Sequence, residues 1–203
     1  MRLIITRHGQ TDENLGEIII GQEADAMLNK HGIMQAQKLA NFLKDEKINF
    51  AYVSSQKRAV HTANEILKFH SSVEIIVAHQ LKEQNLGIYE AKSKVEWKKI
   101  KKNHKEPFHS FKPKDGESYV ELQERIKEFF NDLVKKHKND TVLMVSHGGT
   151  LGMLYLHILN KEITEENYKA HKPENTALTI LDIYQEEPIK IHHLNSTDHL
   201  KHS

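Results

Sequence analysis

The feature that most constrains the fold is a repeated alternation of short apolar runs with longer amphipathic stretches. Four runs are typical of buried strands and are separated by residues with helical spacing of apolar side chains; they span 3–5, 50–53, 73–77 and 141–145. Strands that alternate with helices favour a parallel sheet with helices on both faces. The sequence therefore predicts an α/β fold, a three-layer sandwich with a mostly parallel central sheet flanked by helices.

Apolar spacing and capping signals place the helices of this prediction. We expect helices over about 29–47, 56–69 and 150–159, and a long helix that begins at the capping box formed by Ser118 and Glu121. The buried side of the long helix is expected to carry Leu122, Ile126, Phe129, Phe130 and Leu133. Residues 177–184 and 189–194 are typical of two closing strands that form a hairpin.

The chain of 203 residues contains no internal repeat and no flexible linker. That length suits a single α/β domain, so we expect one domain over 1–203. The segment of about 80–117 includes a lysine-rich stretch and two prolines, Pro107 and Pro113. We interpret this segment as an insertion that covers the functional site.

Composition excludes several classes of protein. Lys and Arg number 29 against 28 Asp and Glu, and this balance argues against a general nucleic-acid binder. The absence of Cys excludes a disulfide scaffold, a thiolate zinc site and a cysteine nucleophile. No run approaches the ~18 apolar residues of a membrane span, and the N-terminus does not resemble a signal peptide. We therefore expect a cytoplasmic protein without a nucleic-acid or membrane partner.

Polar residues that can bind phosphate follow the expected strands. They are Arg7-His8-Gly9 after the first strand, Ser54-Ser55 and then Arg58 after the second, Glu83 after the third, and His147-Gly148-Gly149 after the fourth. The carboxyl ends of parallel strands meet at the same edge of a sheet, where ligands bind. The sequence therefore predicts that these residues converge on one cleft.

The residue types at these strand ends indicate an anion. Only four of the 29 basic residues are Arg, and a forked guanidinium binds phosphate in a way that Lys cannot. Glycines let backbone N–H groups approach an anion closely, and the helix after Gly148-Gly149 directs its positive end to the same place. The predicted cleft is thus a phosphate site that also holds a His nucleophile and a Glu proton donor.

Two other function classes fit parts of this pattern. A metal-dependent phosphoesterase would need several carboxylates beside its His residues, and no such cluster accompanies His8 or His147. An inactive binding module would lack one of the charged residues, and all are present. The lysines of 92–105 fit a solvated helix face better than a second phosphate site.

The C-terminal histidines do not favour a zinc site, because no Cys or paired acidic residues accompany them. These histidines are His192, His193, His199 and His202.

Several runs together resemble the histidine phosphatase superfamily, also called phosphoglycerate mutase-like. The resemblance extends over essentially the whole chain and is carried by residues 7–14 (RHGQTDEN), 28–36, 54–63 (SSQKRAVHTA), 81–90, 116–118, 146–149 (SHGG) and 195–200. Gly21-Gln22 and the segment 87–94 are similar to the fructose-2,6-bisphosphatase-like branch. Two departures are Ala91, where many members have Gly, and Ser55, where an acidic residue is common.

The resemblance implies a role for each matching residue. His8 would be the nucleophile that becomes phosphohistidine, Glu83 the proton donor, and the transferring phosphoryl group would be bound by Arg7, Arg58 and His147. Substrate-binding positions would further include Asn14, Gly21, Gln22 and Gly148. No metal or cofactor would be required, the partner would be a small phosphorylated metabolite, and the chain would act as a monomer or homodimer.

The residues after Glu83 bear on the choice between two activities. Family members that are mutases usually carry Arg-His-Tyr directly after the acid, whereas this chain has Gln84-Asn85-Leu86. The expected function is therefore hydrolysis of phosphate monoesters through a phosphohistidine intermediate. A 2,3-bisphosphoglycerate-dependent phosphoglycerate mutase is the alternative.

Overall fold

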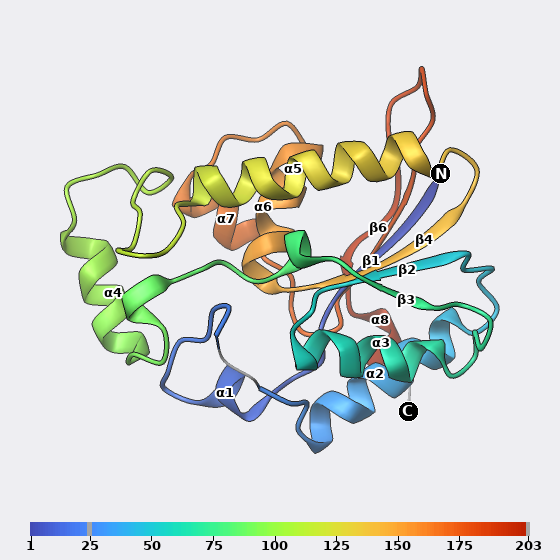
Figure 1. Cartoon of the computed structure of the whole chain (residues 1–203), viewed down its shortest axis with the longest axis horizontal. Coiled ribbons are helices and arrows are strands. Elements are labelled where there is room, and N and C mark those ends of the chain that lie inside the picture. Colours follow the sequence, from blue (N-terminus) through green and yellow to red (C-terminus); the bar gives the residue numbers. More distant parts are fainter. Residues whose placement is uncertain (24–25, 202–203) are drawn as a thin grey trace.

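The computed structural model describes residues 1–23 and 26–201, and within them a six-stranded sheet forms the centre of the molecule (Figure 1). The strand order is β3-β2-β4-β1-β5-β6. The strands are β1 (Arg2–Arg7), β2 (Phe50–Val53), β3 (Ile75–Val77), β4 (Thr141–Ser146), β5 (Leu178–Asp182) and β6 (Lys190–Ser196). The first four run parallel, β5 is antiparallel to β1, and β6 is antiparallel to β5, so the predicted mostly parallel sheet is confirmed.

Alternate residues of the central strands face two separate apolar cores. Leu3 and Ile5 of β1 belong to one core, while Ile4 belongs to the other. The same alternation appears in β4, where Met144 and Leu143 point to opposite faces. Both faces of a parallel sheet are covered in this way, which explains why its strands read as continuous apolar runs.

Helices form the outer two layers. The longer helices are α2 (Lys30–Leu43), α3 (Lys57–Leu67), α4 (Lys94–Asn103), α5 (Tyr119–Lys136) and α6 (Gly148–Ile158), and the shorter ones are α1 (Asp12–Leu15), α7 (Glu165–His171) and α8 (Asp198–Lys201). Buried side chains of α5 and α6 pack on one face of the sheet, and those of α2 and α3 pack on the other. Figure 1 shows these two layers, so the predicted three-layer sandwich is confirmed.

Most predicted elements are present, with boundaries that shift by a few residues. The third strand is shorter than expected because a turn closed by the bond from Val73 N–H to the His70 carbonyl precedes it. The helix expected from residue 150 begins at Gly148. The long helix begins at the predicted capping box, in which Ser118 and Glu121 each bind the other's backbone N–H. Phe129, expected on the buried side of this helix, is only partly buried.

The segment between β3 and α5 leaves the two helix layers. It contains two 3₁₀ turns, His79–Leu81 and Gly87–Tyr89, and helix α4, which stands apart from the sheet in Figure 1. A single antiparallel bridge between Ile18 and Ser93 joins this segment to the loop that follows α1. Residues of α4 therefore lie within reach of the carboxyl ends of the strands.

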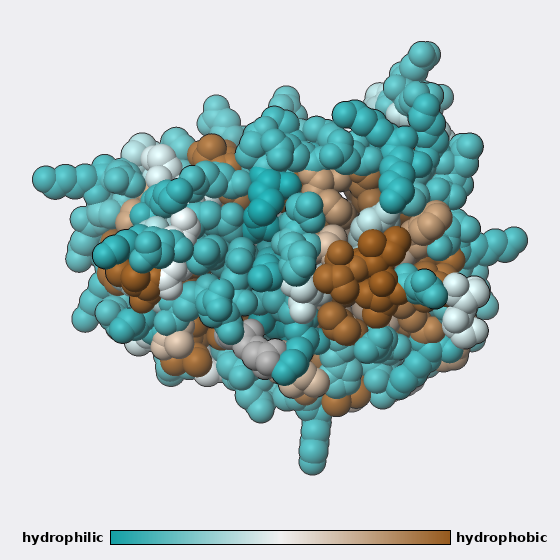
Figure 2. Space-filling view, in the orientation of Figure 1, coloured by the Kyte–Doolittle hydropathy of each residue, from teal (hydrophilic) through white to brown (hydrophobic). Residues whose placement is uncertain are grey.

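The molecular surface is mostly hydrophilic, and the largest apolar patch of the view in Figure 2 lies over the edge of the sheet at β3. Exposed apolar side chains of this edge are Phe69, Ile76 and Val77. Within residues 1–23 and 26–201, none of the helices combines the length and the apolar character needed to cross a membrane.

Candidate active site

A pocket of about 410 Å³ opens at the carboxyl edge of the parallel strands. This volume falls in the range of small-molecule sites. Five of the predicted site residues line it: Arg7, His8, Asn14, Arg58 and Glu83. They come from positions 7 to 83 of the chain, and parallel pairing of β1, β4 and β2 brings the ends of these strands together. The predicted convergence at one edge is therefore present for these residues.

His8 follows the last residue of β1 and is almost completely buried. Its Nδ1 lies 2.7 Å from the carbonyl oxygen of Gly9. A carbonyl oxygen can only accept, so Nδ1 carries the hydrogen and the lone pair of His8 is on Nε2. Burial, and then the positive charges of Arg7 and Arg58, hold the pKa of His8 well below its ordinary value. The imidazole is therefore neutral, with Nε2 available as a nucleophile.

His147 caps α6 from the end of β4 and is completely buried. Its Nδ1 accepts the Nε–H of Arg58 at 3.2 Å, and its Nε2 lies 2.7 Å from Oγ of Ser54. Because an arginine Nε can only donate, Nδ1 bears no hydrogen and Nε2 donates to the serine. Burial and the charge of Arg58 hold the pKa of His147 well below its ordinary value. His147 therefore orients Arg58 in this state.

One nitrogen of the Arg7 guanidinium has a hydrogen-bond acceptor, and another has none among the described residues. One terminal nitrogen donates to the carbonyl oxygen of Pro173 at 2.9 Å. The Nε of Arg7 is buried, and among the described residues none accepts its hydrogen. A buried N–H without an acceptor is costly, and this one belongs to a residue that lines the pocket. An anion in the pocket would supply the missing acceptor.

Glu83 reaches the N-terminus of α6. One carboxylate oxygen accepts the backbone N–H of Gly149 at 3.0 Å, and the other accepts those of Thr150 at 3.1 Å and Gln84 at 2.9 Å. Gly149 has no side chain to obstruct this approach, and a Cβ there would overlap with the Oε1 atom of Glu83. The carboxylate is thus fixed beside the pocket that His8 also lines.

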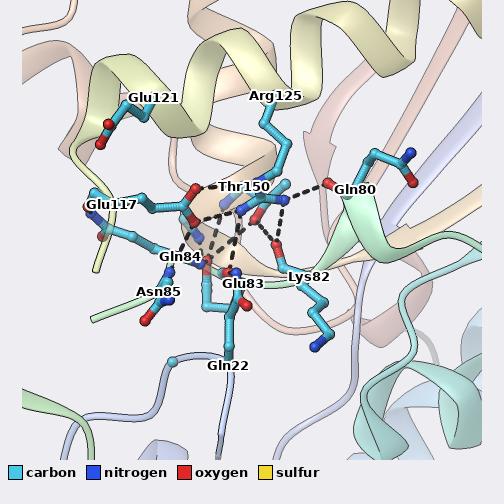
Figure 3. A network of polar contacts seen from close by, with 12 residues as sticks. Gln22, Gln80, Lys82, Glu83, Gln84, Asn85, Glu117, Glu121, Arg125 and Thr150 are labelled. Carbon is cyan, nitrogen blue, oxygen red and sulfur yellow. Dashed lines mark hydrogen bonds and ion pairs between the residues drawn. The ribbon is translucent and has the colours of Figure 1, made fainter. Parts of the chain in front are cut away.

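The backbone around Glu83 is held by a polar network centred on Arg125 (Figure 3). The guanidinium of Arg125 donates to the carbonyl oxygens of Gln80 at 2.5 Å, Lys82 at 3.1 Å and Glu83 at 3.4 Å. It also pairs with the carboxylate of Glu117, with a shortest contact of 2.6 Å. This arginine of α5 therefore fixes the loop that carries the candidate acid.

Of the other predicted binding residues, Asn14 lines the pocket. Gly21, Gln22, His147 and Gly148 are not part of the pocket lining and contact or adjoin the charged groups instead. The Gly21 carbonyl accepts from Arg58 at 3.0 Å, and the Gln22 side chain donates to the Glu83 carbonyl at 2.9 Å. A Cβ on Gly148 would lie 3.3 Å from Nε of Arg7. Asn14 lines the pocket itself and accepts from the Asn175 amide at 3.1 Å. His147, Gly148, Gly21 and Gln22 therefore support Arg7, Arg58 and Glu83 in this structure.

Sequence reasoning missed part of the pocket wall, formed by α7 and the residues after it. Tyr168, Lys172 and Asn175 line the pocket together with Tyr119 of α5. The Lys172 side chain is exposed to solvent. Partial desolvation by the surrounding protein, and then the positive charge of Arg7, nevertheless lower its pKa. The sequence signal that could have located α7 is Thr164 followed by two acidic residues, which is typical of a helix N-terminus. In the structure the Thr164 side chain accepts the N–H of Asn167 and caps the helix.

The two departures from the family pattern have structural counterparts. Ala91 has φ of 61°, the left-handed conformation that a glycine adopts without strain. The hydroxyl of Ser55 is buried, and among the described residues it has no hydrogen-bond partner.

The C-terminal histidines are dispersed. His192 lies 2.6 Å from the Asp182 carboxylate, His199 is buried and lies 3.2 Å from the Thr176 hydroxyl, and His202 lies outside the described residues. In the part of the chain that the structure describes, no three His, Asp or Glu side chains are grouped to bind a metal ion.

Comparisons with known proteins identify the family of the chain and solved structures with a similar fold. Residues 3–197 match the histidine phosphatase superfamily (branch 1). A similar solved structure is the phosphoserine phosphatase of Entamoeba histolytica in complex with 3-phosphoglyceric acid, with a TM-score of 0.82, 29% sequence identity and coverage of 98% of both chains. The match therefore includes the strand-end residues that form the pocket.

Two curated relatives show how much of each chain is shared. The chain is 31% identical over 151 residues to a zebrafish (Danio rerio) protein named probable fructose-2,6-bisphosphatase TIGAR A, which covers 73% of this chain and 59% of the relative. It is 34% identical over 166 residues to a metal-independent phosphoserine phosphatase of Arabidopsis thaliana, with coverage of 77% and 68%. The chain thus spans about three fifths of the zebrafish relative's length.

Proposed function

The chain belongs to the histidine phosphatase superfamily, and on this basis we propose that it is a phosphatase that hydrolyses phosphate monoesters through a phosphohistidine at His8. One observation carries the proposal. A neutral His8, whose Nδ1 is occupied by the Gly9 carbonyl, shares a pocket with two arginines and a carboxylate. This combination supplies a nucleophile, a charge clamp for phosphate and a proton donor.

In the first step, Nε2 of His8 attacks phosphorus. The N–P bond forms as the ester P–O bond breaks, and the transition state spreads negative charge over the equatorial oxygens. Arg7 offers its unsatisfied Nε–H to one oxygen. Arg58, held by His147 and the Gly21 carbonyl, is oriented toward another. Glu83 is the general acid of this step and gives a proton to the departing ester oxygen.

In the second step, water hydrolyses the phosphohistidine. Glu83 takes a proton from the water as its oxygen bonds to phosphorus, and the N–P bond breaks to return the lone pair to Nε2 of His8. The products are inorganic phosphate and the regenerated, neutral imidazole. One difficult displacement is thereby divided into two easier ones.

Metal independence, like the roles of the individual residues, is part of the proposal. It is supported by the two guanidinium groups of the pocket and by the name of the Arabidopsis relative. Hydrolysis is favoured over mutase activity because uncharged residues follow Glu83, and the Gln84 side chain donates to the Glu117 carbonyl at 3.0 Å. We propose in addition a single domain over 1–203 with the segment 80–117 as an insertion, a cytoplasmic location, and small phosphorylated metabolites as partners of a monomer or homodimer.

A quench experiment tests the function. A reaction with ³²P-labelled substrate is stopped in alkali, and the protein is isolated. A phosphoramidate resists base and is lost in mild acid, so the label is expected to survive alkali and to be released by acid. His8→Ala should abolish label and turnover, and His79→Ala is the matched control. Label on a serine, or turnover retained by His8→Ala, contradicts the proposed chemistry.

A further inference from the structure

One face of α4 forms a wall of the pocket. Lys94, Lys98 and Lys101 line it with Trp97, and these positions recur at the spacing of a single helix face. The indole of Trp97 is buried, which turns this face inward. Lys172, which follows α7, lines the same pocket. The lysine-rich stretch is thus not uniformly a solvated surface.

Lys94 already has a structural role. Its ammonium donates to the carbonyl oxygens of Asn14, at 3.0 Å, and Gly16, and so joins α4 to the loop at α1. The ammonium groups of the other three lysines of the wall, Lys98, Lys101 and Lys172, have no ion pair or hydrogen bond to any residue that the structure describes. Lys101 Nζ lies 5.5 Å from the ring centroid of Trp97, and Lys172 Nζ lies 5.6 Å from that of Tyr168. Aromatic faces therefore support these two ammonium groups beside the pocket.

Two of these ammonium groups act on the third, Lys101, through their positive charge. Burial lowers the pKa of Lys101, and the charges of Lys172 and Lys98 lower it further. Glu165 opposes this effect from a distance, but its carboxylate is paired with Lys169 at 2.6 Å. Glu83 opposes the lowering of the Lys172 pKa in the same way. A concentration of positive charge that exceeds the charge of the carboxylates near it favours binding of an anion.

The charge of the pocket exceeds what one phosphoryl group neutralises. Six cationic side chains and two carboxylates are among the described residues that line it: Arg7, Arg58, Lys94, Lys98, Lys101 and Lys172, with Glu13 and Glu83. A phosphate dianion at His8 leaves an excess of positive charge at the α4 wall. We propose that Lys98, Lys101 and Lys172 form a subsite for a second anionic group of the substrate.

This inference rests on the proposed function and specifies its substrate class, a phosphate monoester that carries a second phosphate or carboxylate. A matched series of four-carbon substrates tests it: butyl phosphate, 4-phosphonooxybutanoate and 1,4-butanediol bisphosphate. We expect kcat/KM to rise from the neutral end group to the carboxylate and to the phosphate, by about tenfold or more overall. A carboxylate preferred over a phosphate would assign the subsite to carboxylates, whereas equal kcat/KM for all three would overturn it.

Two double variants separate the subsite from general charge. Lys98→Gln with Lys101→Gln should remove the preference, so that kcat/KM for the two charged substrates falls to the value for butyl phosphate in the same variant. Lys99→Gln with Lys105→Gln removes the same charge from exposed lysines outside the pocket lining and should leave the preference at its wild-type value. If both pairs act alike, the preference comes from long-range charge and the subsite is wrong.

Binding of unreactive analogues distinguishes failure of the subsite from failure of the proposed function. Calorimetric titration compares 1,4-butanebisphosphonate with butylphosphonate in the wild type and in both double variants. Tighter binding of the bisphosphonate, lost only in the Lys98 and Lys101 variant, supports the subsite even if no substrate is turned over. Hydrolysis of aryl phosphate without such a binding difference supports the phosphatase and overturns the subsite.

Discussion

The imidazole rings of His8 and His147 lie side by side, with ring centroids 5.1 Å apart and an angle of 55° between their planes. Each is kept neutral by burial and by neighbouring guanidinium groups. One ring presents an unprotonated nitrogen for attack, and the other accepts from Arg58 and so orients it. Two similar side chains thus perform different tasks because different partners occupy their Nδ1 atoms.

The first prediction concerns stability against acid. The folded-state pKa values of both histidines lie below the ordinary value of about 6.5, so in acid the unfolded chain binds protons first. The free energy of unfolding should therefore be unaffected by these groups above about pH 6.5. Below that pH it should fall by up to about 1.4 kcal/mol per pH unit for each histidine.

Urea denaturation at pH 7.5, 6.5 and 5.5 measures this dependence. His8→Asn removes one titrating group and should flatten the slope between pH 6.5 and 5.5 relative to the wild type. His31, an exposed histidine of α2, provides the control His31→Asn. Identical slopes for His8→Asn and the wild type would contradict the assignment of a buried, neutral His8.

The sheet was predictable because each central strand is buried on both faces and therefore appears as an unbroken apolar run, such as Leu3 to Ile5. The strand-end residues followed from one topological rule, since parallel strands bring their carboxyl ends to one edge. This rule could place Arg7, His8 and Arg58 together without any knowledge of distances.

Other parts of the site depend on contacts that no local pattern encodes. The charge clamp is oriented through pairs such as Arg58 with His147, which are 89 residues apart in the chain. Lys172 reaches the pocket because α7 packs through Tyr168 into the core beneath it. Arg125 is one of only four arginines in the sequence, but apart from Glu117 its partners are backbone carbonyls, which no residue type in the sequence identifies.

The second prediction concerns the acid. Glu83→Gln should reduce kcat for alkyl phosphates by about 10²–10⁴, because the departing alkoxide needs a proton. An aryl phosphate has a better leaving group and should lose much less. The ratio of the two rates in the same variant is the measurement, because any general disturbance at the backbone N–H groups of Gly149 and Thr150 affects both substrates. Equal losses would remove Glu83 from the role of donor.

The third prediction concerns the glycine beneath that carboxylate. An alanine Cβ at position 149 would overlap with the Oε1 atom of Glu83 and lie 3.2 Å from its Cδ. Gly149→Ala should therefore displace the acid and lower kcat selectively for alkyl phosphates, although Ala favours a helix by about 1 kcal/mol over Gly.

Gly152→Ala is the matched control for this variant, because it lies in the same helix and its Cβ would meet Tyr168 at 3.1 Å rather than Glu83. Rates and urea denaturation should be measured for both variants. An unchanged alkyl-to-aryl ratio in Gly149→Ala would show that the carboxylate does not act from this position.

The fourth prediction concerns backbone strain in the loop that joins the 3₁₀ turn Gly87–Tyr89 to α4. Ala91 adopts φ of 61°, which costs an L-residue roughly 1–2 kcal/mol. Ala91→Gly should relieve this strain and raise the free energy of unfolding by about 0.5–1 kcal/mol after the entropy of the unfolded chain is included. Ala170→Gly, in the ordinary helical backbone of α7, should instead lower it. Destabilisation by both variants would contradict the strain.

The last prediction assigns Arg125 as a positioning residue. Its guanidinium is half-buried, pairs with Glu117 and donates to three carbonyl oxygens of the loop that ends at Glu83. Arg125→Gln leaves the Glu117 carboxylate without its cation and should lower the free energy of unfolding by about 2 kcal/mol. Because the loop also sets the place of the acid, the alkyl-to-aryl rate ratio should fall in the same variant, which a purely structural role would not produce.

Two further variants make the assignment of Arg125 decisive. Arg125→Lys keeps the positive charge, but one ammonium cannot bind the Glu117 carboxylate and all three loop carbonyls together. Compared with Arg125→Gln, this variant should therefore regain more of the wild-type stability than of the wild-type rate ratio. Arg125→Gln combined with Glu117→Gln removes both charges and should restore part of the stability, because no unpaired carboxylate remains. If the rate ratio stayed at the wild-type value in all three variants while stability fell, Arg125 would stabilise the fold without placing the acid.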